Sequence, residues 1–329
     1  RTERLNFPTT HPLYGTGPSP READAILVLE TPAPWIPGQN SPNADAKIVW
    51  VDPDPVESRY KTVEFCADMW LPVTAEAAAN AIYEAAKGLL TKSDLDRIEE
   101  RRARLADRKR TLQVAAEQAA EQAGQRRPIH PLWVTYQFGK ILEPDAIVVD
   151  DTIGALDYNY HRRAEPGTYF KSGGSCGGFG SGAAFGAKIA RPDRDVVMAT
   201  GDGYFMFGVP LPALWSASHY KAPFLTVVYV NKSYSTGTLN LADTYPEGAA
   251  VAAGDYEGGM FDPPPNFAKL AEAGNGYGEL VSDPDQVGPA LKRGLEQTRK
   301  GTPAVIAVDL PTLIEERQFL SHRNAEFGR

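Results

Sequence analysis

Two short apolar runs separated by a helical stretch constrain the fold of this chain more than any other feature. Residues 195–200 (DVVMAT) and 224–231 (FLTVVYVN) are rich in β-branched side chains, which is typical of buried strands, and residues 211–220 between them have helical spacing. Such a crossover is right-handed and makes its two strands parallel. Because parallel strands end at the same edge of a sheet, we expect the residues that follow both runs to meet there.

Oxygen-bearing side chains stand at both of these strand ends. Asp202 follows the first strand between Gly201 and Gly203, and Asn231 ends the second. A carboxylate oxygen, an amide oxygen and a nearby main-chain carbonyl make half of an octahedral Mg²⁺ shell, which water and phosphate oxygens usually complete. The flanking glycines permit a sharp turn and let an anion approach main-chain N–H groups. Each motif alone is a common turn, so the prediction of a diphosphate and metal site depends on their occurring together.

The rest of the chain alternates apolar runs with helical stretches, which predicts an α/β protein. Further strands are expected at 23–30, 47–52, 145–151 and 303–310, and further helices at 74–90, 128–142, 266–273, 284–300 and in the second half of the Gly-rich segment 171–190. Thr74 is a predicted N-cap. Residues 145–151 (DAIVVDD) end in two carboxylates, and residues 232–263 are expected to be irregular.

The composition of successive segments predicts four regions. We expect a partial α/β domain over 1–91, a charged helical linker over 92–127, a second α/β domain over 128–312 and a tail over 313–329. The linker holds the basic cluster EERRARLADRKR, which leaves two interpretations open, a nucleic-acid patch and a solvated helix with internal salt bridges. Interleaved acidic residues favour the second interpretation.

Charge and hydropathy exclude several classes of function. The net charge is −8, which argues against nucleic-acid and membrane-surface roles, and no apolar run reaches the roughly 18 residues of a membrane span. Cys66 and Cys176 form no disulfide framework, so a reducing cytoplasmic location is expected. The first residue is Arg and no signal peptide follows, which predicts that the chain begins inside a longer protein.

Gly-Asp-Gly followed by 27 residues and Asn resembles the signature of thiamine diphosphate enzymes. The upstream SGGSCGGFGSGAAFGAKIARPDRDVVMATGDG is similar to the branch that contains acetolactate synthase, benzoylformate decarboxylase and pyruvate decarboxylase, and HPLYGTG with AKIVWVDPDP resembles half of that branch's central domain. The resemblance covers 8–80 weakly and 128–310 well. It implies a three-layer α/β/α fold with a parallel sheet, preceded by part of a Rossmann-like central domain.

The resemblance also implies site roles. Asp202 and Asn231 would ligate Mg²⁺ through their side chains and Ser233 through its main-chain carbonyl. Gly203, Tyr204 and Tyr234 would donate N–H groups to the diphosphate, Thr152 would lie near it, and residues 174–178 would line the two rings of the cofactor. The implied cofactor-binding residues are Gly201, Gly203, Tyr204, Thr152, Ser175, Cys176, Gly177 and Tyr234.

Two departures from the family pattern qualify these roles. Gly177 stands where the family carries a bulky apolar residue under the bent cofactor, so either another side chain supports the bend or the site is wider. The flavin-binding and Trp-containing motifs of acetolactate synthases are missing, which argues against that activity.

The function implied is thiamine diphosphate- and Mg²⁺-dependent cleavage or formation of a C–C bond next to a carbonyl, in a 2-oxo acid decarboxylase or carboligase. No catalytic residue is assigned in this chain, because the glutamate of the family belongs to an N-terminal pyrimidine-binding segment, expected here as a partner. A small carbonyl substrate and a homo- or hetero-oligomer are expected. The alternatives are a 2-hydroxyacyl-CoA lyase, an NAD-dependent dehydrogenase that uses GFGSGAAFG, and a non-catalytic regulatory subunit.

Overall fold

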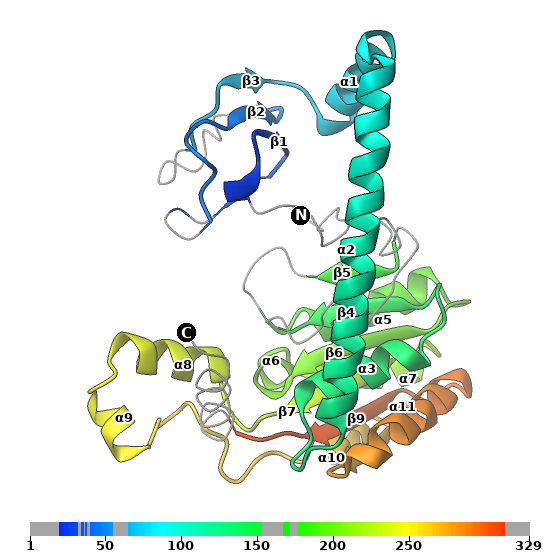
Figure 1. Cartoon of the computed structure of the whole chain (residues 1–329). Coiled ribbons are helices and arrows are strands. Elements are labelled where there is room, and N and C mark those ends of the chain that lie inside the picture. Colours follow the sequence, from blue (N-terminus) through cyan, green and yellow to red (C-terminus); the bar gives the residue numbers. More distant parts are fainter. Residues whose placement is uncertain are drawn as a thin grey trace. The chain divides into compact units, whose positions relative to one another are not determined.

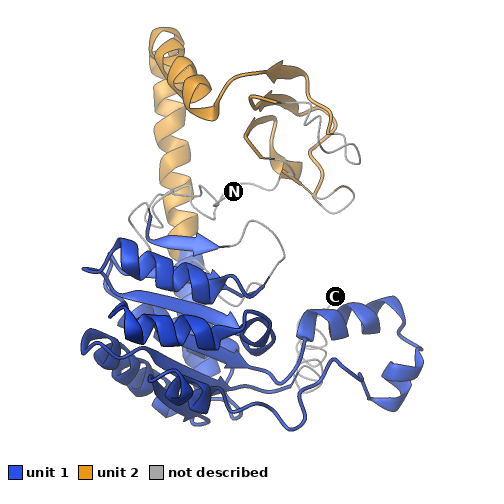
Figure 2. Ribbon diagram, turned by 180° about the vertical axis from the view of Figure 1, so that it is seen from behind, with its two compact units in different colours: residues 1–11, 111–329 blue, residues 12–110 orange. Residues whose placement is uncertain are grey.

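The computed structural model describes residues 20–31, 34–35, 37, 40–54, 65–152, 167–171 and 177–312. The chain divides into two compact units, a smaller one of residues 12–110 and a larger one of residues 1–11 and 111–329 (Figures 1 and 2). Within the described residues, no helix is both long and apolar enough to cross a membrane.

A parallel sheet forms the centre of the larger unit, with its described strands in the order β5-β4-β6-β7-β9-β8 (Figure 1). These strands are β4 (Ile147–Asp151), β5 (Tyr169–Lys171), β6 (Val196–Gly201), β7 (Leu225–Val230), β8 (Tyr277–Val281) and β9 (Ala304–Asp309). The helices are α3 (Pro131–Ile141), α5 (Gly180–Ala190), α6 (Asp202–Phe207), α7 (Pro210–His219), α8 (Ser235–Thr244), α9 (Ala249–Ala253), α10 (Phe267–Ala273) and α11 (Pro284–Arg299).

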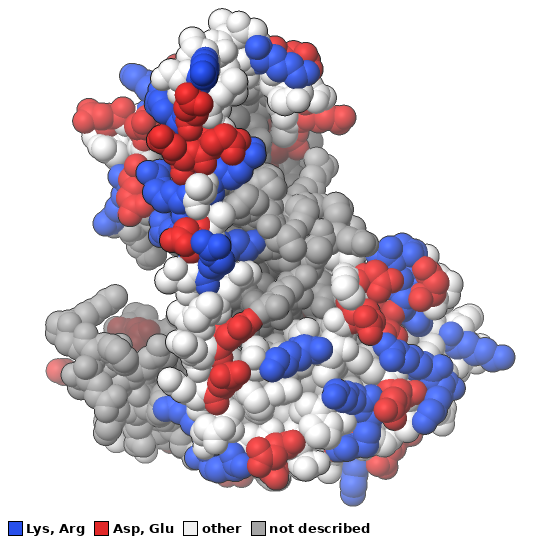
Figure 3. All heavy atoms as spheres, turned by 45° about the vertical axis from the view of Figure 1, so that its right-hand side comes forward, with Lys and Arg blue, Asp and Glu red and all other residues white. Residues whose placement is uncertain are grey.

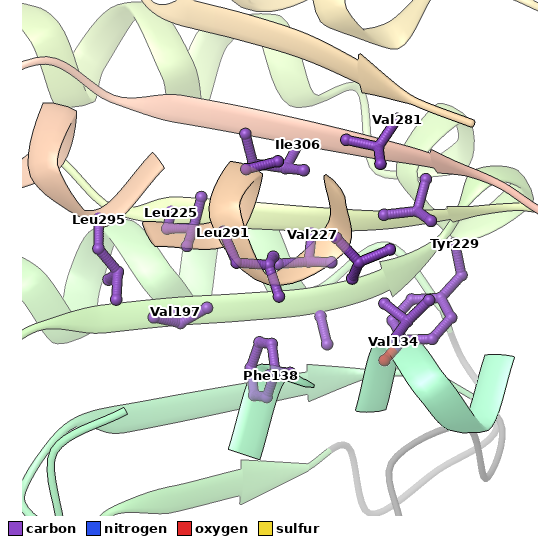
Figure 4. Close-up of a cluster of buried hydrophobic side chains, with 14 of the residues drawn as sticks. Val134, Phe138, Val197, Leu225, Val227, Tyr229, Val281, Leu291, Leu295 and Ile306 are labelled. Carbon is purple, nitrogen blue, oxygen red and sulfur yellow. The ribbon is translucent and has the colours of Figure 1, made fainter. Parts of the chain in front are cut away.

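Helices cover both faces of this sheet, because successive side chains of each strand point to opposite faces. Val197 and Val227 face α3 and α11, whose Phe138 and Leu291 complete that half of the core (Figure 4). The other half of the core joins the opposite strand faces to α5, α7 and α10 through Ala184, Leu214, Ala217, Phe267 and Ala271. The predicted three-layer α/β/α fold with a parallel sheet is therefore confirmed.

The smaller unit holds a separate parallel sheet in the order β1 (Ala25–Leu29), β2 (Lys47–Val51), β3 (Met69–Leu71), preceded by a 3-10 turn at Pro20–Glu22. Trp35, Trp50 and Phe65 pack as a cluster on one face of this sheet, with ring centroids 5.2 to 6.4 Å apart. The helix α1 (Ala75–Leu89) begins after Thr74, whose side chain accepts the N–H of Ala77 at 3.2 Å. The predicted N-cap is confirmed.

One continuous helix, α2 (Lys92–Gly124), occupies most of the predicted linker, and the division between the two units falls within it, after Arg110. Acidic and basic side chains pair along it at i, i+3, as Arg97 does with Asp94 and Arg102 with Glu99. Figure 3 shows the two signs of charge interleaved on the face in view. This mixture supports the solvated-helix interpretation over a nucleic-acid patch. The predicted domain boundaries stay predictions.

Several elements were not predicted from the sequence. The segment 232–263, expected to be irregular, contains α8 and α9, and the short elements β3, β5, β8 and α6 were also missed. The strand β8 lies in a Gly-rich stretch, and a Cβ on Gly278 would stand 1.9 Å from the carbonyl oxygen of Ala268. Glycine is therefore present because α10 packs directly on the strand, and a glycine in this role gives no strand signal in the sequence.

Candidate cofactor and metal site

The strands β6 and β7 are parallel neighbours and end at the same edge of the sheet. Gly201, the last residue of β6, pairs in register with Tyr229 of β7. Asp202 follows at once as the first residue of α6, and Asn231 follows β7. The structure thus places both predicted metal-ligating residues at one carboxyl edge, while their role as ligands stays a prediction.

Asp202 is a buried carboxylate, only 1% exposed. Its Oδ1 accepts the main-chain N–H of Gly203 at 2.8 Å, and its Oδ2 accepts that of Lys232 at 2.5 Å. Burial raises the pKa of Asp202 to about 6, although these main-chain donors act in the opposite direction. The negative charge is held by neutral dipoles, so a cation bound at its surface would relieve the cost of burying it.

Asn231 and Ser233 belong to a tight loop that faces Asp202. Asn231 Oδ1 accepts the N–H of Ser233 at 3.2 Å, and Ser233 Oγ lies 3.0 Å from Ser235 Oγ. Lys232 between them adopts a left-handed backbone with φ of 61°, which aims its own N–H at Asp202. The described residues contain no cluster of three His, Cys, Asp or Glu, so the candidate set is one carboxylate, one amide and one main-chain carbonyl. Such oxygen donors fit a hard divalent cation.

Asp151, at the end of β4, anchors the Gly-rich loop on the same edge. Its Oδ2 accepts the N–H of Gly178 at 3.0 Å and that of Gly180 at 3.3 Å, and Thr200 Oγ1 donates to it at 3.4 Å. Burial raises the pKa of Asp151 to about 6. Gly178 has a φ of 92°, and a Cβ there would stand 2.7 Å from Gly208 Cα. Asp151 therefore holds the chain at Gly178, a position that requires glycine.

The neighbouring Asp150 organises a second polar cluster. Thr152 donates both its N–H and its hydroxyl to Asp150 Oδ1, at 2.9 and 2.7 Å. Tyr169 donates its hydroxyl to Asp150 Oδ2 at 2.5 Å, and Lys171 Nζ lies 3.3 Å from the same oxygen. Asp150 is buried, so these donors stabilise its carboxylate.

Three of the predicted diphosphate contacts have other partners in this structure. Gly203 donates its N–H to Asp202, Tyr234 donates its N–H to the carbonyl of Gly259 at 2.8 Å, and Thr152 donates to Asp150. Tyr204 and Tyr234 each place their ring against a glycine, Gly177 and Gly203 respectively. Ser175 and Cys176 lie outside the described residues.

Sequence reasoning gave no role to Asp150, Asp151 or Lys232. The signal for the first two was present, since the predicted strand 145–151 ends in two carboxylates just as the later strand ends at Asp202. Lys232 carried no signal, because a left-handed backbone at a non-glycine residue is set by the tertiary structure.

Comparisons with known proteins give a family match that covers the candidate site. Residues 152–308 match the model of the thiamine pyrophosphate enzyme, C-terminal TPP binding domain. Over these residues the chain is similar to the C-terminal TPP binding domain of thiamine pyrophosphate enzymes. This domain includes β6, β7 and every residue of the candidate metal set.

Relatives extend the likeness to both units. An acetolactate synthase large subunit of Mycobacterium tuberculosis is 33% identical over 193 residues, covering 57% of this chain and 33% of the relative. A sulfoacetaldehyde acetyltransferase of Castellaniella defragrans is 26% identical over 329 residues, covering 88% of this chain and 52% of the relative. A structure of the thiamine diphosphate-dependent 4-hydroxybenzoylformate decarboxylase of Rhodococcus jostii RHA1 has a TM-score of 0.60 at 22% identity. It covers 88% of this chain and 49% of that protein's chain. The chain thus spans one third to one half of the length of these proteins.

Proposed function

We propose that this domain binds thiamine diphosphate through Mg²⁺ at the carboxyl edge of β6 and β7. The observation that carries the proposal is the buried Asp202 carboxylate, held by main-chain N–H groups beside Asn231. Asp202, Asn231 and the carbonyl of Ser233 would supply three ligands, and diphosphate and water oxygens the others. Because two of the three predicted N–H donors, those of Gly203 and Tyr234, are already bonded, the metal would provide most of the attraction for the diphosphate.

When bound, thiamine diphosphate supplies an electron sink for a carbanion formed beside a carbonyl. The residues of this chain position it. Asp202 and the loop of Asn231 hold the metal, and Asp151 holds the Gly-rich loop through Gly178 and Gly180. We assign no proton-transfer residue within the chain, and propose that a glutamate comes from a pyrimidine-binding segment outside residues 1–329, in an oligomer.

A 2-oxo acid decarboxylase or carboligase is the activity that the relatives favour. The names of the similar proteins include a decarboxylase, an acetolactate synthase and an acetyltransferase, all compatible with chemistry beside a carbonyl carbon. The family match gives no support to the NAD-dependent alternative, because the segment GFGSGAAFG lies inside the matched thiamine pyrophosphate domain.

The test is a calorimetric titration of the full chain with thiamine diphosphate, carried out once in the presence of Mg²⁺ and once in the presence of EDTA. Binding that requires Mg²⁺ is expected, and Mg²⁺-independent binding or none would overturn the proposal. A screen of 2-oxo acids for released CO₂ follows, with and without a co-expressed pyrimidine-binding polypeptide. Release only with that polypeptide is expected. Turnover of a 2-hydroxyacyl thioester instead would reassign the enzyme, and turnover by the chain alone would remove the need for a partner.

A further inference from the structure

Gly177 has no room for a side chain, because the ring of Tyr204 occupies the space. A Cβ at Gly177 would stand 2.2 Å from both Cγ and Cδ1 of Tyr204 and 2.4 Å from Cδ2. These atoms lie at the root of the ring, so a rotation of the hydroxyl end would not relieve the overlap. While Tyr204 keeps its ring in this position, residue 177 has to be a glycine.

Backbone conformation does not explain the glycine. Gly178, the next residue, has a φ of 92° and needs to be glycine for that reason, whereas Gly177 is not among the described residues with positive φ. The requirement at Gly177 is one of space. A contact this close, between a loop and a helix that are distant in sequence, fixes where the ring lies.

Tyr204 belongs to the same short helix as Asp202 of the candidate metal site. Tyr204 is two residues beyond Asp202 in α6, and Gly177 belongs to the loop that Asp151 anchors to the same sheet edge. Tyr204 is partly exposed, so one part of its surface is available to a ligand. In the same turn of α6, the ring of Tyr234 lies against Gly203, where a Cβ would be 2.7 Å from its Cδ1.

We propose that the Tyr204 ring is the surface on which the ring portion of thiamine diphosphate packs. The side chain at position 204 would then take the place of the bulky apolar side chain that the family resemblance implies at position 177. The inference rests on the proposed function. The thiazolium of this cofactor is planar and cationic, and an aromatic face attracts such a group by dispersion and by its quadrupole. The diphosphate end would remain with Asp202 and Asn231.

A swap of side-chain bulk between the two positions tests this. The variants are Tyr204→Ser, Gly177→Leu and the double variant, and Tyr220→Ser is the matched control because Tyr220 is exposed at the end of α7. The probe is thiamine diphosphate with Mg²⁺, titrated into the full chain. Affinity is measured by calorimetry, and the near-ultraviolet circular dichroism of the bound cofactor reports the setting of its rings.

Tyr204→Ser is expected to weaken binding about tenfold and to change the dichroism of the cofactor, while Tyr220→Ser leaves both unchanged. Gly177→Leu alone is expected to abolish binding, and the double variant to return to within about threefold of the wild type. Unchanged affinity in Tyr204→Ser, or a double variant as weak as Gly177→Leu, would overturn the inference.

A measurement without ligand separates this inference from the proposed function. Gly177→Ala is expected to lower the melting temperature of the wild-type chain but not of Tyr204→Ser, since only the first has a ring to displace. Equal effects in both backgrounds would contradict the packing. If the packing is verified but the wild type binds no thiamine diphosphate, the cofactor role of Tyr204 fails together with the proposed function.

Discussion

Lys232, which lies between the candidate ligands Asn231 and Ser233, forms an ion pair with Asp309 at the end of β9. Its Nζ lies 2.7 Å from Asp309 Oδ1, and its main-chain N–H donates to Asp202 Oδ2. One residue with a left-handed backbone therefore couples a partly exposed ion pair to the buried carboxylate of the candidate metal site. A partly exposed ion pair contributes little to the free energy of unfolding, so we expect it to act mainly on the position of the loop of Asn231 and Ser233.

Asp309→Asn is expected to weaken Mg²⁺ binding by about three- to tenfold, because Lys232 loses the partner that restrains it. The affinity for Mg²⁺ is measured by titration in the presence of saturating thiamine diphosphate. The free energy of unfolding should fall by less than about 1 kcal/mol. Asp193→Asn is the matched control, since Asp193 forms a surface pair with Arg191. Equal Mg²⁺ affinity in both variants would show that the ion pair does not position the loop.

Asp202→Asn is expected to remove the stabilisation by Mg²⁺ and thiamine diphosphate while leaving the metal-free fold intact. The amide has one acceptor oxygen, where the carboxylate had two for the main-chain N–H groups of Gly203 and Lys232. The substitution also removes a charge that burial disfavours, since burial raises the pKa of Asp202 to about 6. These effects offset each other to within about 1 kcal/mol at pH 7. Thermal shift with and without ligands checks this, and a retained shift would exclude Asp202 as a ligand.

The convergence of Asp202 and Asn231 could be predicted because it follows from strand direction alone. The contact between Tyr204 and Gly177 could not, since it depends on where α6 packs against a loop distant in sequence. The functions of Asp150 and Asp151 also depend on the tertiary structure, because their donors come from β5 and from the start of α5. Sequence pattern identified the edge of the sheet, and packing decided which groups there are bonded.

The two glycines at positions 178 and 182 should respond to alanine in opposite directions. Gly178→Ala is expected to cost at least about 2 kcal/mol, because its φ is 92° and a Cβ would stand 2.7 Å from Gly208 Cα. Gly182→Ala, inside α5 with nothing within 4 Å, should instead stabilise by up to about 1 kcal/mol. Urea denaturation of both variants measures the difference. A loss at Gly182 equal to that at Gly178 would contradict the described loop.

Asp151 should make stability depend on pH in the direction opposite to that of an ion-paired carboxylate. Burial raises its folded-state pKa to about 6 from the ordinary value of 3.8 for an aspartate. The folded state therefore binds a proton more tightly than the unfolded state. The resulting stabilisation is fully present below pH 3.8 and is lost as pH rises through 6. Between pH 7 and pH 5 it amounts to about 1 to 1.5 kcal/mol in favour of the lower pH.

Asp151→Asn removes this contribution, because the amide is neutral at both pH values and retains one oxygen for Gly178 and Gly180. The stability of the wild type relative to the variant is therefore expected to be greater at pH 5 than at pH 7 by about 1 to 1.5 kcal/mol. Other titrating groups, Asp202 included, are common to both proteins and cancel in this difference. Urea midpoints at the two pH values measure it. A difference that is constant with pH would mean that Asp151 is ionised throughout this range, stabilised by its N–H donors more than burial disfavours it.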